Sequence, residues 1–292
     1  MKKIGLITDE GADLTKEIIE KYDVGIVPVK LIWPEIENLP GENTFQKMRE
    51  LEKQGIKSFG KTSQPSPKDF LDQYKEKLTK YEKVICVTLT SQHSGTFNSA
   101  LMAKNFLSEQ DQERIFVVDS WQASAGEAIF VLKAIDSIEK GKSLEEIVED
   151  LKIFKSKIKT FIMLEDPKWL EYSGRISSMV ANLFRALGQR GIRPFLVFKE
   201  GKLTPGGIKI KAKDKILAFF NQFNNDNAAI KNTEKRIKAV ITHGDNFYLA
   251  QRLKEMIENE FQNAKVEFVN IINNVVGAVT GPDTLILAWA EF

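Results

Sequence analysis

The chain has 292 residues, with 42 Lys and Arg against 40 Asp and Glu, giving a formal net charge of +2. Such a balance excludes a strong general attraction to nucleic acid. The single cysteine, Cys86, excludes an internal disulfide framework, and no apolar run reaches the length that spans a bilayer. Residues 4–7 form too short an apolar region for a signal peptide. We therefore expect a cytoplasmic protein with no nucleic-acid partner and no stable membrane insertion.

The first part of the chain alternates between strand-like and helix-like patterns, which is typical of a mainly parallel sheet covered on both faces. Short apolar, β-branched runs predict strands at residues 4–8, 24–33, 83–89 and 115–119. Apolar residues at helical spacing predict helices at residues 13–22, 45–51 and 67–80 and from about residues 95, 122 and 143. We expect residues 1–160 to form an N-terminal α/β domain.

The pattern changes after about residue 160, where strand candidates follow one another more closely. They lie at residues 161–164, 193–199, 202–204, 237–242, 266–271 and 285–289. Helices are expected from about residues 178, 213 and 247, and Glu200-Gly201 reads as a hairpin turn. The Asn-rich residues 221–232 read as a surface loop. Residues 161–292 are thus expected to form a smaller, mixed α/β C-terminal domain.

Two hydroxyl-rich segments stand out in the first domain. Residues 60–67 carry Thr62 and Ser63, and Ser66-Pro67 reads as the N-cap and first residue of the next helix. Residues 91–96 follow a predicted strand and precede a helix from Gly95, whose Phe97, Leu101 and Phe106 are expected to be buried. Backbone N–H groups and hydroxyls at a helix N-terminus suit an anion. The two segments together predict a carboxylate or phosphate site built from neutral donors.

Acidic and hydroxyl side chains also follow two of the predicted strands. Asp9 comes after the first strand, and Asp119-Ser120 after the strand at residues 115–119. Ligands gather at the carboxyl ends of parallel strands in open sheets. Capping of the following helix is the commoner role for either carboxylate alone, so Asp9 and Ser120 are candidates for support of the site rather than for direct contact.

Histidine and cysteine are too rare here for most catalytic or metal-binding patterns. The chain has two histidines, His93 and His243, and no motif of a Walker loop, a zinc protease or a dinucleotide-binding turn. We therefore expect no metal and no cofactor. An alternative stays open, in which Ser94 acts as the nucleophile of a hydrolase or acyltransferase with His93 as its base. A third possibility is a regulator that binds a small molecule or peptide without lipid.

Five segments, in chain order, resemble the motifs of a known family. Residues 8–14 resemble T-D-S-x-x-D-L, residues 62–67 are identical to T-S-Q-P-S-P, residues 94–100 resemble S-G-T-Y-Q-S-A, residues 118–126 resemble V-D-S-x-x-x-S-x-G, and residues 170–176 resemble a shortened L-E-Y-L-x-x-G-G-R-I. On these residues the chain is identified as a member of the DegV family, the fatty-acid-binding subunits that serve bacterial fatty-acid kinase.

The resemblance implies an acyl chain, palmitate-like in length, buried in a tunnel between or beneath the two domains. It implies that Thr62 and Ser94 grip the carboxylate, with Ser63, Gly95 and Thr96 beside them. It also implies that the protein is not itself an enzyme. A kinase subunit would supply the ATP chemistry, and this chain would present the fatty acid for acyl phosphate formation in phospholipid metabolism.

The same resemblance places three residues of the C-terminal domain near the head group, namely Arg175, Thr280 and Gly281. A late motif of the family, G-x-H-x-G-P-G, appears here as residues 277–283. Val279 or its neighbour stands where the histidine would be, and Asp283 replaces the last glycine. Because that histidine is thought to lie near the head group, its loss concerns phosphate handling more than fatty-acid binding.

Overall fold

The computed structural model describes residues 2–209, 214–231 and 233–292. Contacts divide the chain into two compact units. Unit 1 consists of Met1–Lys30, Thr62–Ile158 and Glu200–Lys202, and unit 2 of Leu31–Lys61, Lys159–Lys199 and Leu203–Phe292.

One boundary between the units, after Ile158, lies close to the expected division at residue 160. Two segments cross that division, since Leu31–Lys61 belongs to unit 2 and Glu200–Lys202 to unit 1. Unit 2 is therefore the larger of the two, whereas the sequence pattern pointed to a smaller C-terminal domain. Whether residues 1–160 and 161–292 fold on their own stays a prediction.

Unit 1 is built on a four-stranded parallel sheet with the order β2-β1-β5-β6. Its strands are β1 (Lys2–Asp9), β2 (Val24–Val27), β5 (Tyr81–Thr88) and β6 (Ile115–Asp119). Parallel strands align their carboxyl ends at one edge, so Asp9, Thr88 and Asp119 end neighbouring strands. The strand expected at residues 24–33 is divided, because Pro28 offers no N–H for a sheet ladder; β3 (Lys30–Ile32) follows it and pairs with β4 (Lys61–Ser63).

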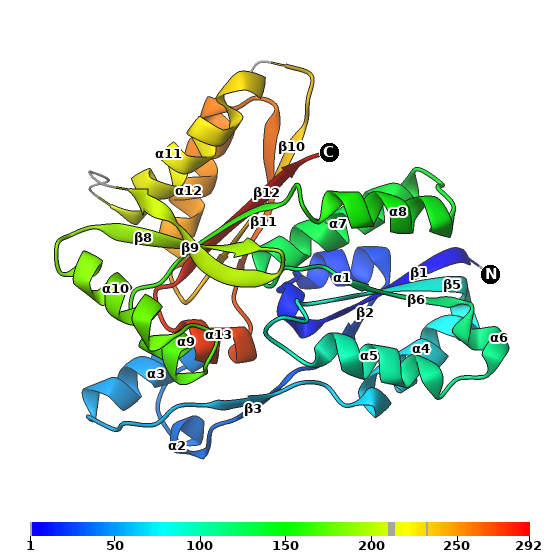
Figure 1. Cartoon of the computed structure of the whole chain (residues 1–292), viewed down its shortest axis with the longest axis horizontal. Coiled ribbons are helices and arrows are strands. Elements are labelled where there is room, and N and C mark those ends of the chain that lie inside the picture. Colours follow the sequence, from blue (N-terminus) through cyan, green and yellow to red (C-terminus); the bar gives the residue numbers. More distant parts are fainter. Residues whose placement is uncertain (1, 210–213, 232) are drawn as a thin grey trace. The chain divides into compact units, whose positions relative to one another are not determined.

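Helices cover both faces of this sheet, as the alternating pattern predicts. In unit 1 the structure describes α1 (Lys16–Tyr22), α4 (Pro67–Lys80), α5 (Thr96–Asn105), α6 (Glu109–Gln112), α7 (Ala125–Glu139) and α8 (Leu144–Phe154), with a 3-10 turn at Glu10–Ala12. α4 and α5 pack on one face, whereas α7 packs on the other and carries α8 (Figure 1). Ser66 and Asp69 form a reciprocal capping box at the start of α4, which confirms the predicted helix start.

Unit 2 contains a six-stranded mixed sheet with the order β11-β10-β12-β7-β8-β9. Its strands are β7 (Lys159–Met163), β8 (Arg193–Lys199), β9 (Lys202–Lys209), β10 (Ile237–His243), β11 (Ala264–Ile271) and β12 (Leu285–Glu291). β10 pairs parallel with β11 and antiparallel with β12, and β7 is antiparallel to both β12 and β8. Glu200 and Gly201 both have positive φ at the turn between β8 and β9, as expected for the predicted hairpin.

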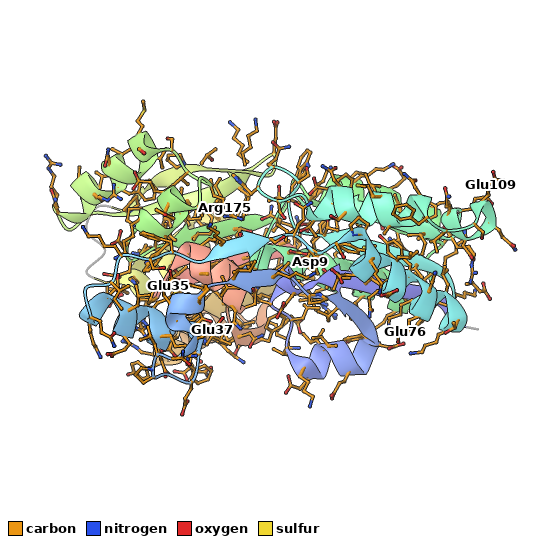
Figure 2. The ribbon with its side chains drawn as sticks, turned by 90° about the horizontal axis from the view of Figure 1, so that it is seen from below. Asp9, Glu35, Glu37, Glu76, Glu109 and Arg175 are labelled. Carbon is orange, nitrogen blue, oxygen red and sulfur yellow. The ribbon has the colours of Figure 1, made fainter. Side chains whose placement is uncertain are left out.

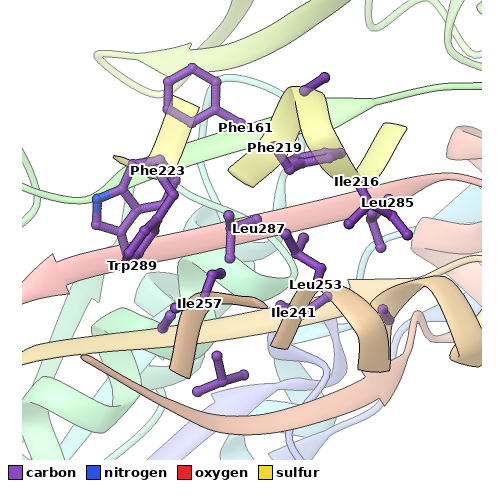
Figure 3. Packing of buried hydrophobic residues seen from close by; sticks show 14 of the residues in the cluster. Phe161, Ile216, Phe219, Phe223, Ile241, Leu253, Ile257, Leu285, Leu287 and Trp289 are labelled. Carbon is purple, nitrogen blue, oxygen red and sulfur yellow. The ribbon is translucent and has the colours of Figure 1, made fainter. Parts of the chain in front are cut away.

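The core of unit 2 lies between this sheet and two long helices, α11 (Lys215–Asn227) and α12 (Phe247–Glu260) (Figure 3). Trp289 lies at its aromatic centre, with its ring centroid 5.3 Å from that of Phe161 and 5.1 Å from that of Phe223. The remaining described helices of this unit are α2 (Pro34–Glu37), α3 (Thr44–Lys53), α9 (Lys168–Tyr172), α10 (Ser178–Gly188), α13 (Asn274–Thr280) and a 3-10 turn at Ala228–Ile230.

The prediction of a surface loop at residues 221–232 is wrong for those of its residues that the structure describes. Residues 221–227 continue α11, and a 3-10 turn follows; residue 232 lies outside the described residues. The apolar spacing of Phe219 and Phe223, both fully buried, outweighs the polar composition between them. Asn227 contributes to the helix end by donating its side-chain amide to the carbonyl of Phe223.

The predicted burial of Leu101 and Phe106 on α5 is also wrong, since their exposed fractions are 37% and 64%. The buried face of α5 carries Ala100 and Ala103 instead. These small side chains let α4 approach closely, and the Tyr74 hydroxyl of α4 donates to the carbonyl of Ala100 (3.0 Å). Large apolar side chains therefore remain on the outer face of the helix.

Candidate functional site

The two hydroxyl segments predicted from the sequence both lie in unit 1. Thr62 and Ser63 belong to the short strand β4, where Thr62 is half-buried and Ser63 is exposed. The second segment forms the turn between β5 and α5, with Gly95 as the N-cap of the helix. We call residues 89–95 the β5–α5 turn.

Gln64 brings the two segments together. A Cβ atom added to Gly95 would lie 2.1 Å from Gln64 Oε1, so the amide of Gln64 rests directly on the start of α5. Gln64 Nε2 also donates to Ser99 Oγ, one turn further along the helix (3.3 Å). Any side chain at position 95 would displace Gln64. The structure thus unites the T-S-Q segment with the S-G-T segment.

Ser94 and Thr96 form the polar centre of the turn. Their hydroxyl oxygens are 2.8 Å apart, and Ser94 Oγ also accepts the backbone N–H of Thr96 (3.2 Å). Thr96 is fully buried, whereas Ser94 is half-buried. If Thr96 donates its hydroxyl hydrogen to Ser94, both lone pairs of Ser94 Oγ are occupied and its own hydrogen remains available to a ligand.

Residues from neighbouring strand ends hold the β5–α5 turn in place. Asp9 Oδ2 accepts the N–H of Leu89 (2.9 Å), and both carboxylate oxygens of Asp119 accept the N–H of Ser91 (3.3 Å each). Thr90 donates its N–H to the carbonyl of Gln122 (2.8 Å). Its hydroxyl donates to the carbonyl of Gly201 (2.8 Å). The turn is therefore fixed by hydrogen bonds at three successive residues.

Asp9 and Ser120, expected as supporting residues, are both fully buried. Asp9 lies inside unit 1, whereas Glu76 and Glu109 of the same unit lie on its surface (Figure 2). Burial raises the pKa of the Asp9 carboxyl to about 7, against the opposing effect of its two backbone N–H donors. The Ser120 hydroxyl donates to the carbonyl of Gln122 (3.3 Å), the same carbonyl that accepts from Thr90.

Sequence reasoning missed Glu127, which is buried next to Asp9. It lies in the first turn of α7, and its Oε1 accepts the hydroxyl of Thr8 (3.0 Å). Burial raises its pKa well above the ordinary value for a glutamate, and the charge of Asp9 raises it further. The only sequence signal is a glutamate within an otherwise apolar helical stretch, residues 125–132.

The three candidates from the C-terminal half lie in unit 2. Arg175 follows α9, donates to the carbonyl of Ser173 (3.4 Å), and has its pKa lowered by burial. Thr280 ends α13 and donates its hydroxyl to the carbonyl of Val276 (2.9 Å). Gly281 has a φ of +88°, and a Cβ there would lie 2.1 Å from Trp169 Cδ1.

The two residues that depart from the late family motif have different surroundings. Val279 is buried in α13. Asp283 has a φ of +59° and accepts a hydrogen bond from Arg49 Nη2 of α3 (3.1 Å), while Arg49 Nη1 binds Asp245 (2.6 Å). A carboxylate at this glycine position therefore belongs to an ion-pair network within unit 2.

The enzyme alternative requires His93 to act on Ser94. Within the described part of the chain, both hydrogen bonds of the Ser94 side chain are with Thr96, and His93 donates its backbone N–H to the carbonyl of Thr90 (3.3 Å). A base at His93 would have to take the hydroxyl hydrogen of Ser94, the same hydrogen that the binding role directs to a ligand.

No helix in the ranges 2–209, 214–231 and 233–292 is long and apolar enough to cross a membrane. Within the same ranges, no group of three or more His, Cys, Asp or Glu side chains is arranged to hold a metal ion.

Comparison with known proteins gives full-length matches. A DegV domain-containing protein of Clostridium perfringens is 31% identical over 100% of this chain and 99% of its own length. A protein of Thermotoga maritima named as a fatty acid-binding protein is 26% identical over 97% of this chain and 96% of its own. A solved structure of a DegV family protein from Thermus thermophilus, described as binding fatty acid, is 27% identical with a TM-score of 0.80, covering 99% of this chain and 100% of the other. The sequence model described as "Uncharacterised protein, DegV family" matches residues 3–291, and the chain belongs to the DegV family.

Proposed function

We propose that this protein binds a long-chain fatty acid without catalysing its chemistry. Thr62 and Ser94 hold the carboxylate, Ser63, Gly95 and Thr96 complete the head-group site, and the acyl chain occupies a buried tunnel. The observation that carries the proposal is the Ser94–Thr96 hydroxyl pair at the N-terminus of α5, placed beside the T-S-Q segment by Gln64. The fatty-acid-binding relatives from Thermotoga maritima and Thermus thermophilus support the choice of ligand.

The head-group site suits a carboxylate on electrostatic grounds. A carboxylate carries one charge and needs only two or three hydrogen-bond donors, which hydroxyls and backbone N–H groups supply. The N-terminus of α5 adds a favourable partial positive charge beside Ser94. Arg175, Thr280 and Gly281 are proposed for the vicinity of the head group, where Arg175 would serve a ligand whose charge rises on phosphorylation.

The acyl chain provides most of the affinity. Burial of about a dozen methylene groups at ~0.8 kcal/mol each contributes on the order of 10 kcal/mol before the costs of binding. The head group then fixes the orientation of the ligand.

A partner kinase would use the bound fatty acid for acyl phosphate formation, with this chain as the carrier. By the resemblance, Val279 or its neighbour in α13 stands at the position of the family histidine, and valine can offer neither a donor nor a positive charge to a phosphoryl group. The change from histidine to valine therefore affects the proposed presentation to a kinase. Fatty-acid binding through Thr62 and Ser94 does not depend on it.

The first test removes the hydroxyls. Thr62→Ala and Ser94→Ala should each weaken binding of labelled palmitate by roughly 1–3 kcal/mol, because each leaves a desolvated carboxylate oxygen short of a donor. Titration of delipidated protein measures the dissociation constants. Thr79→Ala is the matched control, since Thr79 is exposed and its hydroxyl donates to the carbonyl of Glu76 within α4. Unchanged affinity in the Thr62→Ala, Ser94→Ala double variant would place the carboxylate elsewhere.

Mass spectrometry of the denatured, purified protein tests the ligand class directly. Release of fatty acid supports the proposal. A protein that releases no fatty acid and does not bind labelled palmitate contradicts it. A fluorophosphonate probe, applied to the same sample, distinguishes a fatty-acid carrier from a serine hydrolase. Covalent labelling at Ser94 that disappears in His93→Ala would establish the enzyme alternative.

A further inference from the structure

Two carboxyl groups lie buried beneath the β5–α5 turn, one from a strand end and one from a helix. Asp9 accepts the N–H of Gly11 at Oδ1 and the N–H of Leu89 at Oδ2, both at 2.9 Å. Glu127 accepts the hydroxyl of Thr8 at Oε1 (3.0 Å). Its second oxygen, Oε2, is buried and has no hydrogen-bond partner among donors of the described residues. Three of the four oxygens are thus satisfied by donors, and one is not.

The unsatisfied oxygen lies next to Asp9. The point where a Cβ on Gly11 would stand is 2.6 Å from Asp9 Oδ1 and 3.4 Å from Glu127 Oε2. Both oxygens therefore crowd the same small space, which only a glycine leaves open. Two ionised carboxylates that border this one point, both fully buried, would repel each other, and the charge of Asp9 accordingly raises the pKa of Glu127. One proton held between them removes the repulsion and satisfies Oε2 at once.

The surroundings favour retention of this proton. The groups that face the pair are acids: Glu10 and Asp13 from the turn after β1, Cys86 from β5 and Asp119 from the end of β6. Burial and the negative charges of Asp9, Asp13 and Asp119 raise the pKa of Glu127. Burial, with a smaller effect of Glu10, raises that of Asp9 to about 7. Both shifts oppose ionisation of the second carboxyl at neutral pH.

We propose that Glu127 is a positioning residue for the fatty-acid head group: its protonated Oε2 donates to Asp9, and Asp9 in turn holds Leu89 and the β5–α5 turn that carries Ser94. The proposal rests on the proposed function and assigns that site a residue that lies beneath it rather than in contact with the ligand. The proton stays within the pair, and no covalent step is involved.

Loss of the proton should loosen the turn. Two adjacent negative charges would drive Asp9 away from Glu127, and Asp9 cannot move without disturbing its bond to Leu89. The sign of the pH effect follows from the raised pKa of both folded carboxyls. Their stabilising contribution is present in full below the pKa of the unfolded groups. Asp9, whose pKa is about 7, ionises first and leaves one proton in the pair; that proton, and the contribution with it, is lost as pH rises through the raised pKa of Glu127. Affinity for fatty acid should fall over the same window.

The decisive variant is Glu127→Gln. Its side chain has the shape of glutamate, and its amide nitrogen takes the place of the protonated Oε2 as the donor to Asp9, but it cannot ionise. Wild type should lose on the order of tenfold in palmitate affinity between pH 6 and pH 9, since each pKa unit of coupling corresponds to a factor of ten. Glu127→Gln should retain its affinity across this range. Glu127→Ala, which offers no donor to Asp9, should bind weakly at every pH. The ionisation of palmitate affects all variants alike and cancels in the comparison.

Asp119→Asn is the matched control, because Asp119 holds the same turn through Ser91 but is not part of the pair. It should lower the affinity and still lose affinity with rising pH, unlike Glu127→Gln, with the loss shifted toward lower pH because the charge of Asp119 raises the pKa of Glu127. Equal pH profiles for wild type and Glu127→Gln would overturn the proposal, as would equal binding by Glu127→Ala and Glu127→Gln.

Amide exchange in the lipid-free protein separates this inference from the proposed function. With rising pH, protection of the Leu89 and Ser91 amides should decrease in wild type beyond the intrinsic effect of pH, and not in Glu127→Gln. If no variant binds fatty acid at any pH but the exchange follows this pattern, the proposed function fails and the positioning role of Glu127 stands. If protection is the same in both proteins, the positioning role fails whatever the ligand.

Discussion

Two glycines determine how closely polar side chains approach in unit 1. Gly11 leaves room for Asp9 and Glu127, and Gly95 leaves room for Gln64 at the start of α5. Neither residue has a positive φ, so the requirement is space rather than backbone conformation. The head-group site therefore depends on absent side chains as much as on the hydroxyls of Ser94 and Thr96.

Gly95→Ala tests this dependence. The new methyl group would lie within 2.6 Å of three atoms of the Gln64 amide, so Gln64 must leave its position on α5. We expect the free energy of unfolding to fall by roughly 1–3 kcal/mol, the usual cost of overpacking, and fatty-acid binding to weaken in palmitate titration because Gln64 no longer joins the two hydroxyl segments. Gly188→Ala is the control, because nothing lies within 4 Å of a Cβ there. An unchanged affinity in Gly95→Ala would mean that Gln64 does not contribute to the site.

Local chemistry decides which single residues the sequence could predict. The Ser66–Asp69 capping box spans three residues and was predictable from Ser66-Pro67 with the acid that follows. Gln64 and Gly95 are 31 positions apart, so no local pattern predicts their contact. The two motifs that contain them were nevertheless recognised, and the sequence predicted that both belong to one site. Glu127 lies 118 positions from Asp9, and nothing local marks a glutamate in α7 as protonated. Its role depends on burial, which only the folded chain shows.

At the level of elements, composition and periodicity disagree in α11, and periodicity prevails. Four asparagines and one aspartate fall within residues 221–227, which favours a loop by propensity alone. Phe219 and Phe223 nevertheless stand four residues apart and are fully buried against the sheet of unit 2 (Figure 3). The polar residues occupy the remaining faces of the helix. Tertiary packing thus overrides a composition that is poor in helix formers.

Phe223→Ala measures the contribution of this packing. The ring of Phe223 is edge-on to those of Phe261 and Trp289, with centroid distances of 5.1 Å. We expect the free energy of unfolding to fall by about 3–5 kcal/mol, as for other buried phenylalanines, measured by urea unfolding. Phe220→Ala is the comparison, because Phe220 is only partly buried against the same core and should cost less. Equal losses in the two variants would contradict the assigned core.

At the scale of the whole molecule, the chain path departs from the sequential arrangement that the pattern predicts. The chain leaves unit 1 after Lys30 and returns at Thr62. Between these residues, α3 packs within unit 2, where Phe45 lies against Gly277 and Arg49 pairs with Asp245 and Asp283. These partners are some 200 residues away in sequence. Local periodicity predicts that α3 exists but carries no information about the unit that contains it.

A fragment of residues 1–160 should therefore contain a folded unit 1 with an unprotected segment at residues 31–61. In the full chain this segment buries Phe45, Met48 and Leu51, and removal of residues 161–292 takes away α13, which packs on α3 with Gly277 against the Phe45 ring. Limited proteolysis read by mass spectrometry should cut the fragment first within residues 31–61, whereas the full-length chain resists cleavage there. Exposed apolar side chains should also increase the binding of a hydrophobic dye.

A second fragment provides the control, with residues 31–61 replaced by a short Gly/Ser linker. β3 and β4 pair with each other, so the ends to be joined lie on neighbouring strands, about 5 Å apart. This fragment should unfold at the same temperature as residues 1–160 and bind less dye, because the replaced segment adds nothing to unit 1. Protection of residues 31–61 in the 1–160 fragment would show instead that the segment packs on unit 1, and that the division at residue 160 describes a domain that folds on its own.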